Sequence, residues 1–249
     1  MPHTRYLILL IILMGSITET SAQSVIQAGF WNVENLFDTT DAPLINDGDF
    51  TPAGRYEWTE ERLITKFSSL TKVIYDLDQG KLAILGLAEI ENLQVLDRFN
   101  EEYLQMNLRI IHKESPDERG IDCALLYNPA LVKLESQRFH TVPLAGNEKT
   151  RDIIEAQFTN DQSGHLLYVF VNHWPSRWGG QEKTDPLRRA AASVLRTRLN
   201  ELLIKDPKAD ILIMGDFNDY PDDPSLREVL NAGPRQSHPY PGSLFNTTW

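Results

Sequence analysis

Polar side chains follow four apolar segments of the chain, at the points where the apolar runs end. These side chains are, in chain order, Asn32, Glu89, Asn172, His173, Asp216 and Asn218. In α/β sheets, ligands bind where strands end and loops begin. Any one of these residues could instead form a local turn or cap a helix. Because four segments end in the same way, we expect their polar side chains to gather at one site.

The residue types indicate what chemistry this site could perform. Oxygen donors such as Glu89 and Asn32 suit Mg²⁺, with Mn²⁺ or Ca²⁺ as alternatives. Zinc has less support, because the chain has no His-Glu-x-x-His motif and no Cys/His ligand spacing. A divalent metal, an aspartate that orients or deprotonates water and a protonated histidine together suit phosphoester hydrolysis. Nucleotide cofactors and serine-hydrolase chemistry have no supporting motif.

The loop after His173 could contribute to substrate binding. Arg177 could contact a phosphate, although a solvated loop arginine is an equally good interpretation. Trp174 and Trp178 could stack on a base or a sugar, and simple packing is at least as good an explanation.

The chain alternates between strand-like and helix-like segments. Leu63, Phe67 and Leu70 recur at helical spacing, which predicts a helix over 60–78. A long helix capped by Thr184 or Asp185 should carry Pro186 in its first turn. Further helices are expected at 93–103 and 224–231, and strands at 25–31, 82–87, 108–112, 121–127, 131–140, 151–158, 166–171 and 211–214. This order predicts an α+β fold, a layered sandwich of mixed sheets flanked by helices.

Composition limits the partners and the cellular location. With 24 basic and 35 acidic residues, the net charge of −11 gives no general attraction to nucleic acid, so a polyanionic substrate must be held locally. Residues 1–22 predict a cleaved signal peptide and hence a secreted or periplasmic protein, with 23–249 as one domain. A retained anchor is the alternative, although the apolar run at 6–14 is too short to span a bilayer. The lone Cys123 is expected to be a core thiol rather than a nucleophile.

The chain resembles the endonuclease/exonuclease/phosphatase superfamily, which includes deoxyribonucleases, abasic-site endonucleases, sphingomyelinases and inositol-polyphosphate phosphatases. It is most similar to the secreted or exported bacterial branch. The resemblance extends over about residues 25–230 and depends on four motifs in the family's order. They are Phe30-Trp31-Asn32-Val33-Glu34-Asn35, Leu87-Ala88-Glu89-Ile90-Glu91-Asn92, Asn172-His173-Trp174-Pro175-Ser176-Arg177 and Gly215-Asp216-Phe217-Asn218. The implied fold is deoxyribonuclease-like.

The resemblance also implies a role for each matched position. Asn32 and Glu89 would bind the metal, and His173 would contact the scissile phosphate. Asp216 would orient or activate water, and Asn218 would steady the phosphate or that water.

Other residues near the motifs are weaker candidates. Asp122 could orient His173 through a hydrogen bond, and Arg119 and Asn172 could bind substrate. For Arg151 and Asp152, a structural ion pair is the better interpretation.

The chain departs from the family near its end. The family normally has a late Ser/Thr-Asp-His segment that supplies a catalytic Asp–His pair. No such segment follows Asp219, and the later His238 has no Asp before it. We therefore expect the last strands and the general-base half of the site to be missing. Such a chain is either a fragment, which is the interpretation that we favour, or a member of a branch that works without the pair.

The resemblance predicts a divalent-metal-dependent hydrolase of phosphodiester bonds, endonuclease-like, acting on DNA or RNA by in-line attack of activated water. A phosphatase or a phospholipid phosphodiesterase of the same fold is an alternative. A secreted binding protein without catalysis is another, because the Asp–His pair is missing. A different metallophosphoesterase class is disfavoured, because Asn172-His173 precedes Gly215-Asp216.

Overall fold

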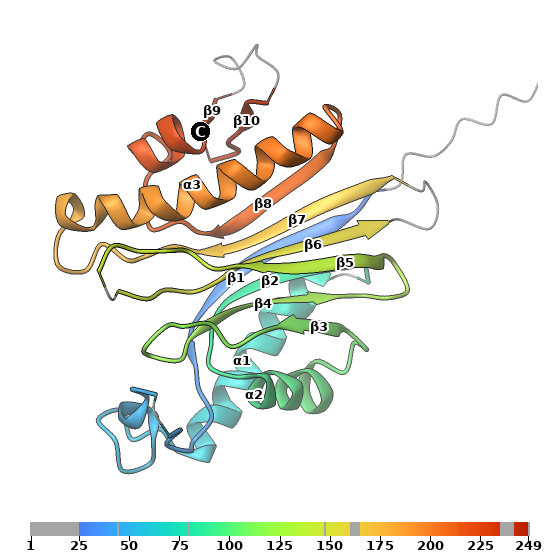
Figure 1. The fold of residues 1–249 in the computed structure, drawn as a ribbon. Coiled ribbons are helices and arrows are strands. Elements are labelled where there is room, and N and C mark those ends of the chain that lie inside the picture. The colour runs from blue at the N-terminus through green and yellow to red at the C-terminus, as the bar shows by residue number, and fades with distance from the viewer. Residues whose placement is uncertain are drawn as a thin grey trace, which may run out of the picture.

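The computed structural model describes residues 25–43, 45–78, 80–146, 148–159, 165–234 and 242–248. Two four-stranded sheets lie face to face, with helices on their outer sides (Figure 1). The predicted fold class, α+β with mixed sheets flanked by helices, is confirmed. The predicted signal peptide and His238 lie outside the described residues, so those predictions remain as they were.

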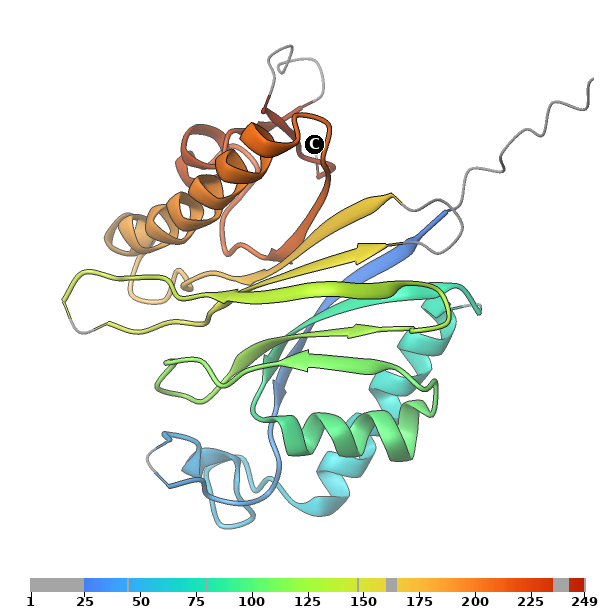
Figure 2. The ribbon, with the colours of Figure 1, turned by 45° about the vertical axis from the view of Figure 1, so that its right-hand side comes forward.

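The first sheet has the strand order β1-β2-β4-β3. Its strands are β1 (Gln27–Leu36), β2 (Leu82–Ile90), β3 (Arg109–His112) and β4 (Asp122–Tyr127). β1 and β2 run parallel, and β4 is antiparallel to both of its neighbours. The outer face is covered by α1 (Glu60–Asp78), α2 (Leu93–Arg98) and the helical turn η2 (Phe99–Leu104), as Figure 2 shows. A short turn, η1 (Gly48–Phe50), precedes α1.

The second sheet has the strand order β5-β6-β7-β8. Its strands are β5 (Lys133–His140), β6 (Ile153–Thr159), β7 (Leu166–His173) and β8 (Asp210–Asp216). The predicted antiparallel pair is confirmed as β5 and β6, while β7 and β8 run parallel. The crossover between β7 and β8 is α3 (Gln181–Lys205), which covers the outer face. The chain continues through η3 (Ser225–Val229), β9 (Ala232–Gly233) and β10 (Leu244–Phe245).

The core between the sheets determines how closely they approach. It contains Ile84 and Leu125 from the first sheet and Val171 from the second. A side-chain carbon added at Gly86 would lie 2.8 Å from the sulfur of Met214, so glycine permits the close approach. Cys123 is buried in the same core, and burial raises the pKa of its thiol. The structure therefore places it as a packed core residue.

Two element boundaries differ from the sequence prediction. The long helix begins at Gln181, and the Thr184 amide already donates to the Gly180 carbonyl. Pro186 therefore lies in the second turn, where its ring removes one helical hydrogen bond. The first strand continues past Asn32 to Leu36 through a bulge that sequence periodicity could not reveal.

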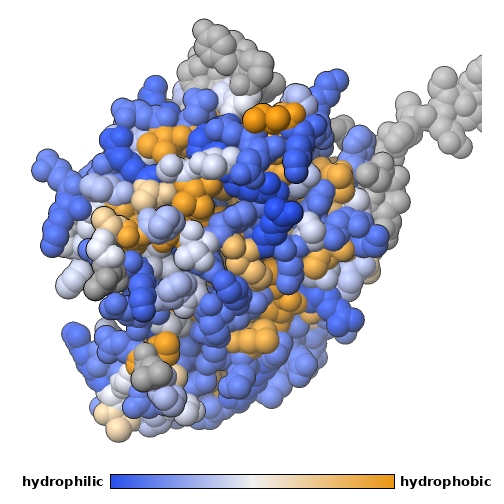
Figure 3. All heavy atoms as spheres, viewed as in Figure 1, coloured by the Kyte–Doolittle hydropathy of each residue, from blue (hydrophilic) through white to orange (hydrophobic). Residues whose placement is uncertain are grey.

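The surface is largely polar. The face shown in Figure 3 is mostly hydrophilic, and apolar side chains interrupt it in separate places. None of the helices in the described ranges is both long enough and apolar enough to cross a membrane.

A buried ion pair attaches α3 to the second sheet. Arg198 of α3 donates two hydrogen bonds of 2.8 Å to Glu155 of β6, and His140 Nε2 lies 2.6 Å from the same carboxylate. Burial alone would raise the pKa of Glu155, but the bonds from Arg198 and His140 lower it to about 2.

This lowered pKa predicts acid sensitivity. A carboxyl whose pKa is lower in the folded state stabilises the fold fully above its ordinary pKa of 4.5, and this contribution is lost as pH falls toward 2. The free energy of unfolding, measured with urea at pH 6 and pH 3, should fall less between these values in Glu155→Gln than in the wild type. Glu201→Gln, which alters an exposed partner of Arg198, is the control and should behave as the wild type. An equal fall in Glu155→Gln would contradict this account.

Candidate functional site

Four strands bring polar side chains to one end of the sandwich. In β1 and β2, Asn32 lies beside Ala88 and next to Glu89, and in β7 and β8 His173 lies beside Asp216. The two sheets meet where β1 packs on β8. The sequence prediction that these strand ends converge therefore agrees with the geometry.

The amide of Asn32 links the two sheets. Its Nδ2 donates to Glu89 Oε1 at 3.2 Å and to Asp216 Oδ2 at 3.0 Å. Its Oδ1 accepts a 2.9 Å bond from the Glu34 backbone. Two carboxylates from different sheets thus converge on one amide, which concentrates negative charge at this point.

His173 lies against the same two carboxylates. Its Nε2 is 3.8 Å from Glu89 Oε1 and 3.9 Å from Asp216 Oδ2, and its side chain is 3% exposed. Burial, followed by the charges of Arg151 and Arg119, lowers the pKa of His173 well below its ordinary value. Burial therefore disfavours the protonated form that the sequence analysis expected. The effect of burial on the pKa depends on the packed structure, so the sequence motif around His173 could not predict it.

Unusual backbone conformations occur at the ends of β2, β7 and β8. A side-chain carbon at Gly215 would lie 2.4 Å from the Asn172 carbonyl oxygen, so only glycine fits there. Asn218 has a φ of 53°, and Glu89 a φ of 66°, both in the left-handed region that non-glycine residues seldom occupy. Such strain persists where surrounding contacts enforce it, and it concentrates at functional sites.

Asn218 organises the loop after β8. Its backbone amide donates to Asp216 Oδ1 at 3.0 Å, and its side chain donates to the Trp174 carbonyl at 3.0 Å. The loop after β7 and the loop after β8 are therefore joined directly beside Asp216.

Asn172 and Trp174 do not reach the site surface, which corrects the expectation that Asn172 binds substrate and favours the packing interpretation of Trp174. Asn172 is fully buried, with its Nδ2 bonded to the Met214 carbonyl and its Oδ1 to the Trp174 indole. Trp174 is 1% exposed and packs edge-on against Phe217. Both are positioning residues beneath the loop. Trp178 is 91% exposed and remains available for a contact.

Asp122 does not orient His173 in this structure. Its Oδ2 lies 3.3 Å from His112 Nε2, and its Oδ1 accepts a 2.8 Å bond from the Ser115 amide. His173 Nδ1 has no hydrogen-bond partner among the described residues. The prediction for Asp122 was wrong because strand alternation directs its side chain to the other face of the first sheet.

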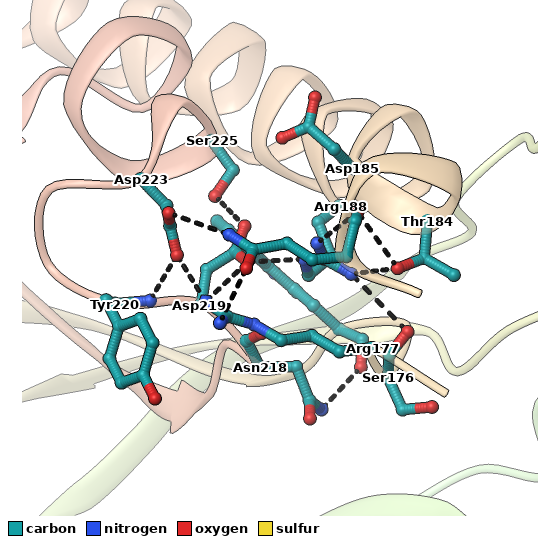
Figure 4. A network of polar contacts seen from close by, with 12 residues as sticks. Ser176, Arg177, Thr184, Asp185, Arg188, Asn218, Asp219, Tyr220, Asp223 and Ser225 are labelled. Atoms are coloured by element: carbon teal, nitrogen blue, oxygen red, sulfur yellow. Dashed lines mark hydrogen bonds and ion pairs between the residues drawn. The ribbon is translucent and has the colours of Figure 1, made fainter. Parts of the chain in front are cut away.

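The guanidinium of Arg177 is bound by the protein itself, which does not support the predicted phosphate contact. Its Nε donates to the Asn218 carbonyl at 2.7 Å, and its Nη2 pairs with Asp219 and Asp223. Its guanidinium also lies over the ring of Tyr220. These contacts make Arg177 a support for the loop after β8 (Figure 4).

A cleft of about 1110 Å³ runs along β8 and reaches the candidate site. It is lined by the apolar edge of β8, including Ile211 and Ile213, and by Asp216 and Asn218 at one end. In the described part of the second sheet, β8 has a neighbour on one side only. Side chains from β8 and the following loop therefore meet solvent here.

A model described as the Endonuclease/Exonuclease/phosphatase family matches residues 27–249. The chain belongs to this family. A comparison with curated protein sequences gave no significant match.

Solved structures of low sequence identity share the fold of this family member. The human Nocturnin catalytic domain with bound sulfate is 19% identical with a TM-score of 0.52, over 65% of this chain and 60% of that domain. Truncated TDP2 from Caenorhabditis elegans is 17% identical with a TM-score of 0.51, over 65% of this chain and 58% of that one. A mannosyl-6-phosphatase from Bacteroides thetaiotaomicron is 14% identical with a TM-score of 0.56, and the match covers 80% of this chain and 67% of that enzyme. The chain thus spans about three fifths of the first two.

Enzymes of this family generally use divalent metals. The donor set at the candidate site fits such an ion, because Glu89 and Asp216 place two carboxylate oxygens against one amide. Both carboxylates are partly exposed, at 15% and 32% of their side-chain surfaces, so an ion could reach them. Asn32 fits less directly as a ligand, because its amide nitrogen rather than its oxygen faces the carboxylates.

The sequence analysis missed one basic residue near this site, Lys66 of α1. Its Nζ donates to the Glu34 carbonyl at 3.1 Å. Burial lowers its pKa, while the charges of Glu34 and Glu89 act in the opposite direction. A single basic residue on a helix gives no sequence signal that could have identified this position. Arg151, which the sequence analysis did name, is buried and donates to the carbonyls of His173 and Trp174.

The predicted structural role of Arg151 agrees with this geometry, although its partner is different. Its Nη1 pairs with Asp117 at 2.9 Å, and Asp152 pairs with Lys113 at 2.7 Å. Arg119 is half exposed, with its Nε 3.9 Å from Asp117, and its charge acts on His173. It is thus a cation near the site that retains access to solvent.

A buried network supports the loop that follows Asp216. Asp219 is 1% exposed and contacts Arg188 Nε at 2.6 Å, Arg177 Nη2 at 3.1 Å and Ser225 Oγ at 2.6 Å. Arg188 itself is fully buried and donates to Thr184 Oγ1. Figure 4 shows these side chains converging from α3, from the loop after β7 and from the loop after β8.

Asp219→Asn should destabilise the fold strongly. It keeps the side-chain shape but leaves the Arg188 charge buried without a counter-ion, a change that typically costs about 3–5 kcal/mol. Urea unfolding at pH 7 measures the loss. Asp185→Asn, which breaks the more exposed pair with Arg189, should cost no more than about 1 kcal/mol. A similar loss in the free energy of unfolding in both variants would show that the buried ion pairs stabilise the fold no more than the exposed pair does.

Proposed function

We propose that this protein is a divalent-metal-dependent hydrolase of phosphodiester bonds, endonuclease-like, that acts by in-line attack of water. The convergence of Glu89, Asp216 and His173 on Asn32 at the ends of β1, β2, β7 and β8 carries the proposal. Family membership supports the general class of phosphoester hydrolases.

Glu89, with Asn32 beside it, would hold the metal, for which Mg²⁺ is the best candidate and Mn²⁺ or Ca²⁺ are alternatives. The bound ion would stabilise negative charge on a phosphate oxygen. For Asn32 to contribute its oxygen, the amide would have to turn from the orientation that it has here.

Asp216 would orient the attacking water. Its Oδ1 is fixed by the Asn218 amide, which leaves Oδ2 directed toward Asn32 and His173. His173 would contact the scissile phosphate through Nε2, the ring nitrogen that faces both carboxylates. Because burial disfavours the protonated imidazole, its contribution would be a hydrogen bond rather than a full positive charge.

Nearby cations would bind the rest of the substrate. Arg119 is half exposed and lies close enough for its charge to act on His173, so it is the best candidate for a phosphate contact. A net charge of −11 means that such local cations and the metal must attract any polyanion. A phosphatase acting on a small phosphoester is therefore the second candidate, because a small substrate needs no extended basic surface.

Export to the periplasm or the medium is part of the proposal and depends on the predicted signal peptide at residues 1–22. Processing at this point would leave the candidate site unchanged, since every residue assigned to it lies later in the chain.

Glu89→Gln should abolish metal-dependent catalysis while the fold is retained. A metal ion contributes several kcal/mol to charge stabilisation, so kcat/KM should fall by about 100-fold or more. Bis-p-nitrophenyl phosphate, plasmid DNA and p-nitrophenyl phosphate, each with Mg²⁺ or Mn²⁺, measure diesterase, nuclease and phosphatase activity separately. Hydrolysis of the monoester alone would favour the phosphatase.

A thermal melt with and without Mg²⁺ tests metal binding independently of turnover. Glu89→Gln should lose most of the metal-induced rise in Tm. Glu61→Gln, an exposed change on α1, should keep both the rise and the activity. An unchanged rise in Glu89→Gln would refute the assignment of Glu89 as the metal ligand.

A further inference from the structure

A second cluster of ligand-type side chains contains none of the residues that form the candidate active site. His112 ends β3, Asp122 begins β4, and Glu114 lies in the connection between them. One ligand atom from each residue can be chosen so that all three atoms lie within 4.8 Å of one another. None of the three matches a motif of the family resemblance.

The buried atoms of this cluster lack hydrogen bonds. The His112 and Asp122 side chains are 2% and 1% exposed, and His112 Nε2 and Asp122 Oδ2 both have no hydrogen-bond partner among the described residues. The two atoms lie 3.3 Å apart without hydrogen-bond geometry. Buried polar atoms nearly always have a partner, so this pair requires an explanation.

The spacing of the two buried atoms suits a shared metal ion. Two ligand atoms about 2.0–2.2 Å from a tetrahedral zinc ion lie about 3.4 Å apart. His112 Nε2 and Asp122 Oδ2 are separated by 3.3 Å. The Glu114 side chain is 62% exposed, and its Oε1 lies 4.0 Å from the His112 ring, so it can rotate toward the same ion.

The local charge also favours a cation. The carboxylates of Glu114 and Asp122 lie close together beside one imidazole. Two carboxylates at such a distance repel each other, and a cation between them would relieve that repulsion.

The cluster projects from the opposite face of the first sheet. Along β4, Cys123 and Leu125 point into the core between the sheets, whereas Ala124 and Leu126 point toward α1 and α2. Asp122 shares the face of Ala124, because side chains alternate along a strand. His112 is paired with Ala124 across β3 and β4 and therefore lies on that face too.

We propose that His112, Glu114 and Asp122 form a zinc site distinct from the candidate active site. One imidazole and two carboxylates, with water in the remaining position, are a suitable ligand set for Zn²⁺. Mg²⁺ is a poorer match, because it is bound mainly by oxygen ligands and keeps several waters.

The site would fix the connection between β3 and β4. That segment contains Asp117, which pairs with Arg151, and Arg151 binds the carbonyls of His173 and Trp174. A metal at its base would hold Arg119 and Asp117 in place beside the candidate active site. The zinc site itself does not depend on the proposed function.

The test is a Zn²⁺ titration of the metal-free protein by competition with a chromophoric chelator, in excess Mg²⁺ to occupy the candidate active site. The wild type should bind one Zn²⁺ per chain. His112→Gln should weaken binding by about 100-fold, because it removes one of few ligands, whereas Glu89→Gln should bind Zn²⁺ as the wild type does. Circular dichroism of each metal-free variant checks that it folds.

Glu114→Gln provides a second test in case the buried variant does not fold. Its side chain is exposed, so the change should leave the fold intact and still weaken Zn²⁺ binding by about 10-fold. Replacing zinc with Co²⁺ should give visible d–d absorption that is lost in His112→Gln and kept in Glu89→Gln. The proposal is overturned if the wild type binds no Zn²⁺, if both His112→Gln and Glu114→Gln bind it normally, or if Glu89→Gln abolishes it.

Discussion

Two carboxylates from different sheets meet at one amide, and the arrangement of the site depends on holding them there. Glu89 and Asp216 would repel each other if nothing lay between them, and both are partly withdrawn from solvent. The Asn32 amide donates to both carboxylates, and Asp216 lies 184 residues after Asn32 in the sequence. Two donor bonds leave two negative charges uncompensated, which favours a cation at this point. The close approach of the sheets at Gly86 permits this convergence.

The arginines around this site act mainly on the protein itself. Arg151 binds the backbone carbonyls of His173 and Trp174, and Arg177 binds that of Asn218. Arg188 is buried against Asp219. Each fixes a loop that follows β7 or β8, so these three guanidinium groups are bound by the protein itself and do not pair with Glu89 or Asp216. The negative charge of the site is therefore left for a metal ion to neutralise, as the proposed hydrolysis requires.

The sequence predicted the strands and their convergence, because apolar runs and their polar ends are local patterns. Asn32, Glu89, His173 and Asp216 lie together for this reason. The roles of Asp122, Asn172 and Arg177 were wrong in the prediction. Which face of a strand Asp122 occupies, and which partners Arg177 finds, depend on register and on loops far apart in the chain. The lowered pKa of His173 likewise follows from burial, which only the packed structure determines.

Strand alternation separates two acidic positions on the first sheet. Glu89 lies where β2 meets the second sheet, whereas Asp122, beside Ile90 in the neighbouring strand, points toward the helices. Each position joins one imidazole to two carboxylates, His173 with Glu89 and Asp216 at the first and His112 with Glu114 and Asp122 at the second. At the first position the Asn32 amide also binds both carboxylates, whereas at the second the facing atoms of His112 and Asp122 have no hydrogen-bond partner among the described residues. The connection between β3 and β4 joins the two positions physically, since Asp117 and Arg151 extend from the proposed zinc site to the backbone of His173. A change in the buried cluster would therefore act on the candidate active site through the position of that backbone.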